Sequence, residues 1–119
     1  MENKRRFRSL SRRADFLHLK SAGITFHVNS WLLVNMQRTT TDQIRCGWTI
    51  PRQVGGAVLR NRFKRWGREY LRKWSVGQRQ SVDMNLIFKR QAAGYYTRVS
   101  HKDFDEAMDK LVAQLQRRR

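Results

Sequence analysis

Large apolar side chains recur at helical spacing between Leu59 and Trp74, and this pattern constrains the fold more than any other part of the sequence. Relative to Leu59, they occupy positions i+4, i+7, i+11 and i+15, at 100° per residue, and so share one side of a helix. The series consists of Leu59, Phe63, Trp66, Tyr70 and Trp74. It predicts a long amphipathic helix whose aromatic side packs in the core of a domain.

The opposite side of the same predicted helix is strongly basic. It carries Asn61, Lys64, Arg65, Arg68 and Arg72, with Arg60 and Arg62 at its flanks. Four of these positions, 61, 65, 68 and 72, form a single stripe about one turn apart, a spacing that can follow successive phosphates. We call Asn61, Arg65, Arg68 and Arg72 the cationic stripe.

A charged helix face is usually only solvated surface. A solvated face tends to alternate acids with bases, whereas here the one nearby acid, Glu69, lies off the stripe. Like charges one turn apart destabilise an isolated helix by a few tenths of a kcal/mol per pair. The pattern therefore favours a surface that binds a polyanion.

The charge of the whole chain supports the same interpretation. The 119 residues, enough for one domain, contain 26 basic and 9 acidic side chains, a formal net charge of +17. Arginine outnumbers lysine by 19 to 7, and its planar donor fork suits phosphates and bases of RNA. Nucleic acid is the expected partner, with an anionic membrane surface second. We expect residues 1–119 to form a single RNA-binding domain with a flexible basic arm at 1–13 and a basic tail at 117–119.

Other classes of protein fit the sequence poorly. The apolar run at residues 31–34 is too short to cross a bilayer, and the basic N-terminus lacks the apolar segment of a secretory signal. A single cysteine, Cys46, excludes an internal disulfide framework and a zinc site with several cysteines. A soluble cytoplasmic protein is expected.

The acids and histidines are too scattered to suggest catalysis by the protein itself. Phosphodiester hydrolysis requires clustered carboxylates for metal ions or a paired general acid and base. The acids before the last predicted helix are Glu2, Asp15, Asp42, Glu69 and Asp83, and the histidines are His18, His27 and His101. We therefore predict no catalytic residue, no metal ligand and no nuclease activity for the protein alone.

The rest of the chain predicts a mixed α and β domain. Helices are expected at 14–20 and at 100–116, where Ser100 and Asp103 resemble a capping pair. Strands are expected within 25–36, with a break at 29–30, and in the alternating segments 44–50 and 82–88. Gly55 and Gly56 lack the Gly-Lys-Ser/Thr ending of a P-loop and are expected to turn the chain from strand to helix.

The central segment resembles the bacterial ribonuclease P protein component. The resemblance rests on Gly-Trp-Thr-Ile at 47–50, on Val-Gly-Gly-Ala-Val-Leu-Arg-Asn-Arg-Phe-Lys-Arg at 54–65, and on Arg68-Glu69 after it. An Asp-Phe pair at 15–16 and a Val-Asp pair at 82–83 extend it over most of the chain. It implies an α+β fold, an αβββαβα two-layer sandwich with a central mixed sheet and a left-handed βαβ crossover, an exception to the usual hand.

The resemblance also implies a function. Members are the protein subunit of a ribonucleoprotein that removes the 5′ leader from precursor tRNA, and the RNA subunit carries out the hydrolysis with bound Mg²⁺. The expected partners are therefore ribonuclease P RNA and precursor tRNA, in a complex of one protein monomer and one RNA, with Mg²⁺ held mainly by RNA subunit and substrate. The alternative is a structural RNA-binding module, such as a ribosomal protein, without a role in cleavage.

By position, the resemblance assigns two groups of site residues. The RNA-binding group comprises Arg52, Arg60, Asn61, Arg62, Lys64, Arg65, Arg68 and Arg72, and the leader-binding group comprises Phe16, Lys20, Arg12 and Arg13. From the residues alone, Phe16 is more simply a core side chain. The sequence departs from the family pattern in two places: Lys20 replaces a frequent aromatic residue, and Pro51-Arg52-Gln53 replaces the more usual Ser-Lys-Lys. Gly67, within the predicted helix, costs up to about 1 kcal/mol relative to alanine.

Overall fold

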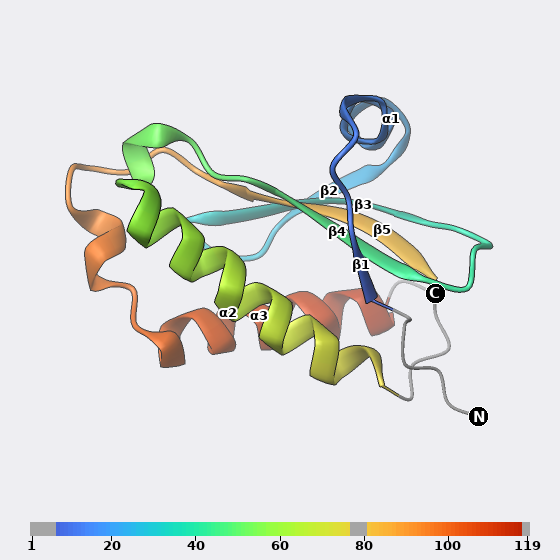
Figure 1. Ribbon diagram of the computed structural model, residues 1–119. Helices are drawn as coiled ribbons and strands as arrows, with labels where there is room; N and C mark the ends of the chain where they lie inside the picture. The colour runs from blue at the N-terminus through green and yellow to red at the C-terminus, as the bar shows by residue number, and fades with distance from the viewer. Residues whose placement is uncertain (1–6, 77–80, 118–119) are drawn as a thin grey trace.

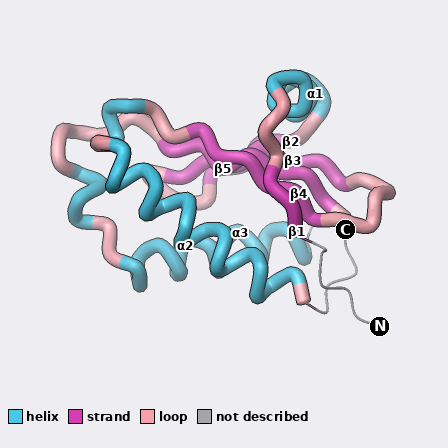
Figure 2. Tube along the Cα trace, in the orientation of Figure 1, coloured by secondary structure: helices cyan, strands magenta, loops and turns pink. Residues whose placement is uncertain are grey.

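One mixed β-sheet separates the helices into two layers in the computed structural model, which describes residues 7–76 and 81–117 (Figure 1). Helix α1 lies on one face of the sheet, and α2 and α3 lie on the other (Figure 2). The elements in chain order are β1 (Phe7–Ser9), α1 (Arg13–Ala22), β2 (Ile24–His27), β3 (Leu32–Arg38), β4 (Ile44–Thr49), the 3-10 helix η1 (Arg52–Val54), α2 (Ala57–Ser75), β5 (Val82–Phe88), the 3-10 helix η2 (Tyr95–Arg98) and α3 (His101–Arg117).

The strand order of the sheet is β1-β4-β5-β3-β2. β1, β4 and β5 run parallel, whereas β3 pairs antiparallel with both β5 and β2. The connection from β4 through α2 to the adjacent β5 is left-handed (Figure 1). The expected α+β sandwich with its mixed sheet is therefore confirmed, and the chain adds one short edge strand, β1, before it.

The basic arm predicted at 1–13 is not a free segment over its second half, which corrects that prediction. Phe7 to Ser9 pair with Ile44 to Cys46 of β4, and Leu10, which is buried, donates its backbone N–H to the carbonyl of Cys46 at 2.9 Å. Two apolar side chains, Phe7 and Leu10, hold this stretch to the core in spite of its charge. Residues 1–6 of the predicted arm and 118–119 of the predicted tail lie outside the described residues.

The core lies between the sheet and the pair α2 and α3. The alternating residues of β5 contribute Val82, Met84 and Leu86, all fully buried, as their spacing predicts. Burial raises the pKa of the Cys46 thiol on β4 well above its usual range, so that this cysteine is an inert core residue. α3 buries the predicted series Phe104, Met108, Leu111 and Leu115.

The buried side of α2 is rotated relative to the prediction. Its centre runs through Phe63, Gly67, Leu71 and Ser75, whereas Trp66, Tyr70 and Trp74 are half-buried beside it. The cause is Trp48 of β4, whose ring occupies the space where a Cβ on Gly67 would stand. Gly67 therefore has a packing role: it lets a bulky indole lie against the helix backbone.

The start of α3 confirms the capping pair. The Ser100 hydroxyl accepts the backbone N–H of Asp103 at 3.0 Å, and the Asp103 carboxylate accepts the backbone N–H of Ser100 at 3.0 Å. At the other end of the helix, the Arg38 guanidinium donates to the carbonyl of Leu115 at 2.6 Å. Side chains therefore form hydrogen bonds at both ends of α3. In α2, by contrast, the N-cap residue Gly56 provides no side-chain hydrogen bond.

Candidate RNA interface

Helix α2 presents the cationic stripe to solvent. Asn61, Arg65 and Arg72 are exposed and Arg68 is half-buried, so the stripe predicted from spacing forms a continuous polar surface. Arg72 lies over the ring of Phe7 at 5.8 Å from its centroid, which connects this surface to β1. The stripe therefore runs along the side of α2 that borders the sheet edge.

The other cations predicted to bind RNA surround the stripe. Lys64 is half-buried, and Arg62 lies over the Trp66 ring at 5.8 Å from its centroid. Arg60 is half-buried and donates from Nε to the carbonyl of Gly55 at 3.2 Å. Arg52 is exposed in η1, just ahead of the helix. All eight residues thus lie on one continuous segment, η1 followed by α2.

In residues 7–76 and 81–117, no carboxylate forms an ion pair with a cation of α2. Four acids instead occupy the first half of α3: Asp103, Asp105, Glu106 and Asp109. An uncompensated basic helix in a chain of charge +17 provides a field that attracts polyanions.

The entry to α2 depends on a glycine. Gly55 has φ 156°, a backbone conformation that favours glycine, and a Cβ there would lie 2.6 Å from Leu59 Cδ2. The predicted turn from strand to helix at Gly55 and Gly56 is thereby confirmed. It brings Arg52 to the beginning of the helix, next to the segment that carries Arg60 and Asn61.

The leader-binding residues lie in the other layer. Phe16 of α1 is half-buried, and its ring covers Gly47 of β4 so closely that a Cβ at Gly47 would overlap it. Arg12, Arg13 and Lys20 are exposed at the two ends of α1. Phe16 is thus neither a fully enclosed core residue nor a free one, because it rests on the sheet with part of its surface accessible.

A partly buried ion pair on the sheet face connects to α1. Arg45 of β4 donates from Nε and one terminal nitrogen to the two carboxylate oxygens of Asp83, at 2.9 and 2.7 Å, and the same guanidinium lies 3.8 Å from Asp15 of α1. The hydrogen bond to Asp83 raises the pKa of Arg45, against the opposing effect of desolvation. This pair joins α1 to the two central parallel strands.

Two amide–hydroxyl pairs occupy the same sheet face. Asn85 donates to the Thr49 hydroxyl at 2.9 Å, and the Thr25 hydroxyl donates to Asn35 at 2.6 Å. Together with Arg45 and Asp83 these residues were missed as site candidates. Their signal was the polar residue at every second position of otherwise apolar strands, which indicates a second, polar face of the sheet.

Two classes of site find no support in the described part of the chain. No group of three or more histidine, cysteine, aspartate or glutamate side chains there could hold a metal ion. None of the helices in the same residues is long and apolar enough to cross a membrane.

The arrangement of an Arg-Asn-Arg helix, a left-handed crossover and a helix resting on the opposite sheet face can be compared with known families. The family model described as Ribonuclease P matches residues 4–116. The chain belongs to the ribonuclease P protein family. It is similar to the ribonuclease P protein component of Desulforapulum autotrophicum, at 33% identity over 103 residues that cover 87% of each chain.

Two solved structures of the family share the fold. The ribonuclease P protein from Thermotoga maritima is 28% identical, with a TM-score of 0.74, and the match covers 94% of this chain and 98% of that one. The Staphylococcus aureus protein aligns with a TM-score of 0.78 over 90% of this chain and 94% of that one. Its identity is 19%, so that this second likeness concerns the fold alone.

Proposed function

We propose that this protein is the RNA-binding subunit that helps the catalytic RNA of ribonuclease P to remove the 5′ leader of precursor tRNA. The observation that carries the proposal is the cationic stripe on α2, which no carboxylate of the described residues neutralises, in a chain of this family. Membership of the family implies partnership with ribonuclease P RNA and a role in an endoribonuclease complex.

The first contribution is binding of RNA phosphates by α2 and η1. The three exposed residues of the stripe, with Arg68 beside them, follow one line about one helical turn apart, so that successive residues meet successive phosphates. Each phosphate that an arginine neutralises releases condensed counterions, and binding becomes salt-dependent as a result. The guanidinium fork adds bidentate geometry that lysine lacks.

The second contribution is binding of the leader by α1 and the adjacent sheet face. An unpaired base stacked on the accessible part of the Phe16 ring would contribute about 1–3 kcal/mol. The exposed cations Arg12, Arg13 and Lys20 would bind leader phosphates on either side of it. Because the Arg45–Asp83 pair and Asp15 hold α1 against the strands, this surface would be organised before the leader arrives.

The protein supplies no group to the hydrolysis in this proposal. Mg²⁺ is held mainly by the RNA subunit and the substrate, and the cations of the protein lower the repulsion between the two RNA molecules. Less Mg²⁺ is then needed for them to associate. One protein monomer would act with one RNA, in the cytoplasm.

The decisive experiment is cleavage of precursor tRNA by a bacterial ribonuclease P RNA at low Mg²⁺, with and without the protein. We expect stimulation by the protein and no cleavage by the protein alone. A matched pair of variants, Arg65→Ala on the stripe and Lys102→Ala on α3, separates stripe-dependent stimulation from a general effect of charge. Tight, salt-sensitive RNA binding without stimulation would instead indicate a structural RNA-binding module, and metal-dependent cleavage by rigorously purified protein would contradict the proposed division of labour.

A further inference from the structure

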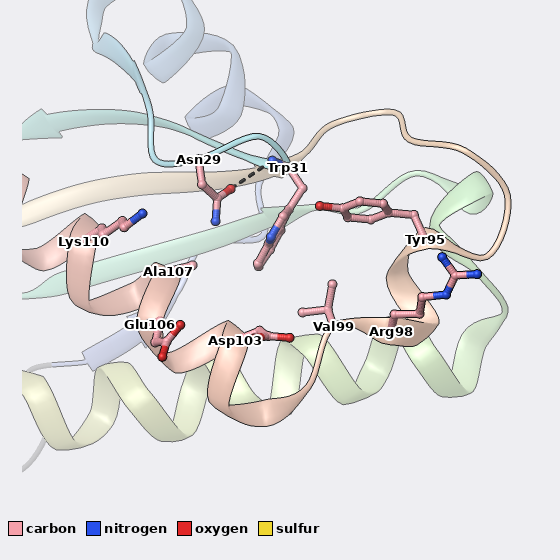
Figure 3. Close-up of a pocket in the computed structure, with 9 residues that line it drawn as sticks. All are labelled: Asn29, Trp31, Tyr95, Arg98, Val99, Asp103, Glu106, Ala107 and Lys110. Atoms are coloured by element: carbon pink, nitrogen blue, oxygen red, sulfur yellow. Dashed lines mark hydrogen bonds between the residues drawn. The ribbon is translucent and has the colours of Figure 1, made fainter.

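A cavity of about 350 Å³ lies on the α3 side of the molecule, between the β2–β3 turn, η2 and the first half of α3 (Figure 3). Cavities of this size accept small ligands such as a nucleobase with its sugar. The residues that line it are Asn29, Trp31, Tyr95, Arg98, Val99, Asp103, Glu106, Ala107 and Lys110. These residues come from other elements than the cationic stripe and the α1 face.

One hydrogen-bond donor in this cavity is fixed in orientation. The side-chain oxygen of Asn29 accepts the backbone N–H groups of Trp31, at 2.9 Å, and Leu32, at 2.8 Å. Because that oxygen is engaged twice, the amide nitrogen must point the other way, and Figure 3 shows it directed into the cavity. Asn29 thus offers a donor that is in place before any ligand arrives.

The opposite wall offers an acceptor. Glu106 is exposed and has no hydrogen-bond or ion-pair partner among the described residues. The neighbouring Asp103 already accepts the N–H of Ser100 at the helix start, which leaves Glu106 as the unoccupied carboxylate. Arg98 and Lys110, both exposed, add one cation at either end of the cavity (Figure 3).

The floor is apolar and rigid. Trp31, Val99 and Ala107 are buried there. The Trp31 ring is held by Phe88, at a centroid distance of 5.6 Å, and by Phe104 at 6.4 Å. At the η2 end, the half-buried ring of Tyr95 provides an aromatic surface for a flat ligand. A preformed apolar floor with a few fixed polar groups is the usual form of a small-ligand site.

The charge of the whole chain, rather than that of the cavity lining, favours an anionic ligand. Two cations and two carboxylates line the cavity, so its own charges balance, while the chain as a whole carries +17 and concentrates anions around it. A flat, hydrogen-bonding ligand that also carries negative charge is a nucleotide. We infer that this cavity binds a guanosine 5′-phosphate unit, with the base over the apolar floor.

Guanine matches the donor and acceptor pattern better than adenine or uracil does. Its N1–H and N2–H groups lie side by side and would both donate to the Glu106 carboxylate, and the adjacent O6 would accept from Asn29. Adenine turns an acceptor, N1, toward the carboxylate, and uracil offers a single N–H. The phosphate would pair with Arg98 or Lys110. This chemistry is the same for free GMP and for an unpaired guanosine within an RNA strand.

Binding is tested on the full chain by calorimetry with GMP, AMP, UMP and inorganic phosphate, and by amide chemical shifts of the labelled protein. We expect saturable GMP binding at sub-millimolar concentration and a preference over AMP and UMP of about fivefold or more. The GMP shifts should centre on residues 29–32, 95–99 and 103–110. Inorganic phosphate should move only resonances of the basic surfaces. GMP shifts confined to α2, or equal binding of all three nucleotides, would overturn the inference.

Three variants with matched controls test the individual groups. Glu106→Gln should weaken GMP binding at least fivefold and remove the preference over AMP, whereas Glu69→Gln on α2 should change neither. Asn29→Asp keeps the oxygen that accepts from Trp31 and Leu32 but loses the donor, and it should also weaken binding. Lys110→Met is compared with Lys102→Met outside the cavity. If all three cavity variants bind GMP like the wild type, the site is wrong.

A final comparison distinguishes the two sources of the ligand. The hexanucleotides UUUGUU and UUUUUU are titrated into the wild type and Glu106→Gln. A preference for the guanosine-containing strand that GMP competes away and that Glu106→Gln abolishes supports the inference with RNA as the source. GMP binding without that preference supports it with the free nucleotide as the source. These outcomes do not depend on the cleavage assay, so this inference and the proposed function can fail separately.

Discussion

Helices α2 and α3 pack on the same face of one sheet with comparable apolar sides, yet their outer sides carry opposite charge. α2 carries Arg60, Arg62, Lys64, Arg65, Arg68, Arg72 and Lys73 against the single acid Glu69. α3 begins with four acids, Asp103, Asp105, Glu106 and Asp109, in positions that its own dipole stabilises. Packing determines the inner sides of both helices, whereas only the outer side of α2 is proposed to contact RNA.

A hydrogen bond between polar side chains connects α2 and α3. The Tyr70 hydroxyl donates a hydrogen bond to Asp109, and burial together with this bond raises the pKa of Tyr70 well above its usual value. Nearby, the His101 ring stacks on Trp66 at a centroid distance of 4.4 Å. α3, with its acids, therefore packs beside α2 without neutralising the cationic stripe, because the stripe lies on the side of α2 that faces away from α3.

The strongest destabilisation should come from substitutions on the inner sides, where the two helices should behave alike. Phe63→Ala in α2 and Phe104→Ala in α3 each remove a fully buried ring, and the rings lie 6.1 Å apart. We expect each to lower the free energy of unfolding by about 3–5 kcal/mol, measured by urea denaturation. If one substitution lowers the free energy of unfolding and the other does not, the two helices do not share one core.

The next effect is specific to α2, because only there does a tryptophan lie directly on a helical glycine. Gly67→Ala places a methyl group into the Trp48 ring and should lower the free energy of unfolding by about 1–3 kcal/mol, although alanine is the better helix former. Gly56→Ala is the comparison: a Cβ there meets nothing within 4 Å, so its loss is limited to the weaker N-cap preference of alanine. An unfolding curve for Gly67→Ala like that of the wild type would mean that Trp48 moves aside.

The outer sides should differ in RNA binding. Replacing both Arg65 and Arg68 by alanine should weaken binding to ribonuclease P RNA by about 10-fold at moderate salt. The slope of log K against log salt concentration should become shallower by about one unit per lost contact, as measured by filter binding. The matched α3 control, Lys102→Ala, should leave the slope unchanged. Equal slopes in the stripe variant and the α3 variant would place the RNA elsewhere.

The smallest effect concerns the ends of the helices. Ser100→Ala removes the cap of α3 and should cost about 1 kcal/mol of unfolding free energy in thermal or urea denaturation. At the corresponding position of α2, Gly56→Ser should gain at most a few tenths of a kcal/mol, since glycine is already tolerated there. If Ser100→Ala leaves the free energy of unfolding unchanged, water accepts the backbone N–H of Asp103 in place of the serine hydroxyl.

Local patterns predicted most elements of this fold. The alternation in β4 and β5 and the capping pair at Ser100 each follow from neighbouring residues, and the structure has them in the expected places. The spacing within α2 likewise predicted which cations share one side. These features depend on backbone geometry, which a short stretch of sequence determines by itself.

The features that were missed depend on contacts between distant parts of the chain. β1 forms because β4 offers it an edge, and the charge of its segment hides that possibility. Which side of α2 is buried depends on Trp48 of β4, which packs against Gly67 and lies nine residues before the first residue of the helix, Ala57. The Arg45–Asp83 pair joins strands 38 residues apart. No periodicity within one element reports on such partners.

The attachment of β1 has a consequence for the time scale of events at the N-terminus. Three residues and one neighbouring strand hold it, and two of its three side chains face solvent. Its amide protons should therefore exchange by local opening, much faster than those of β5, which open only with the whole domain. Since Arg72 rests on Phe7, each opening also frees one end of the cationic stripe, and RNA bound there would slow the exchange of β1.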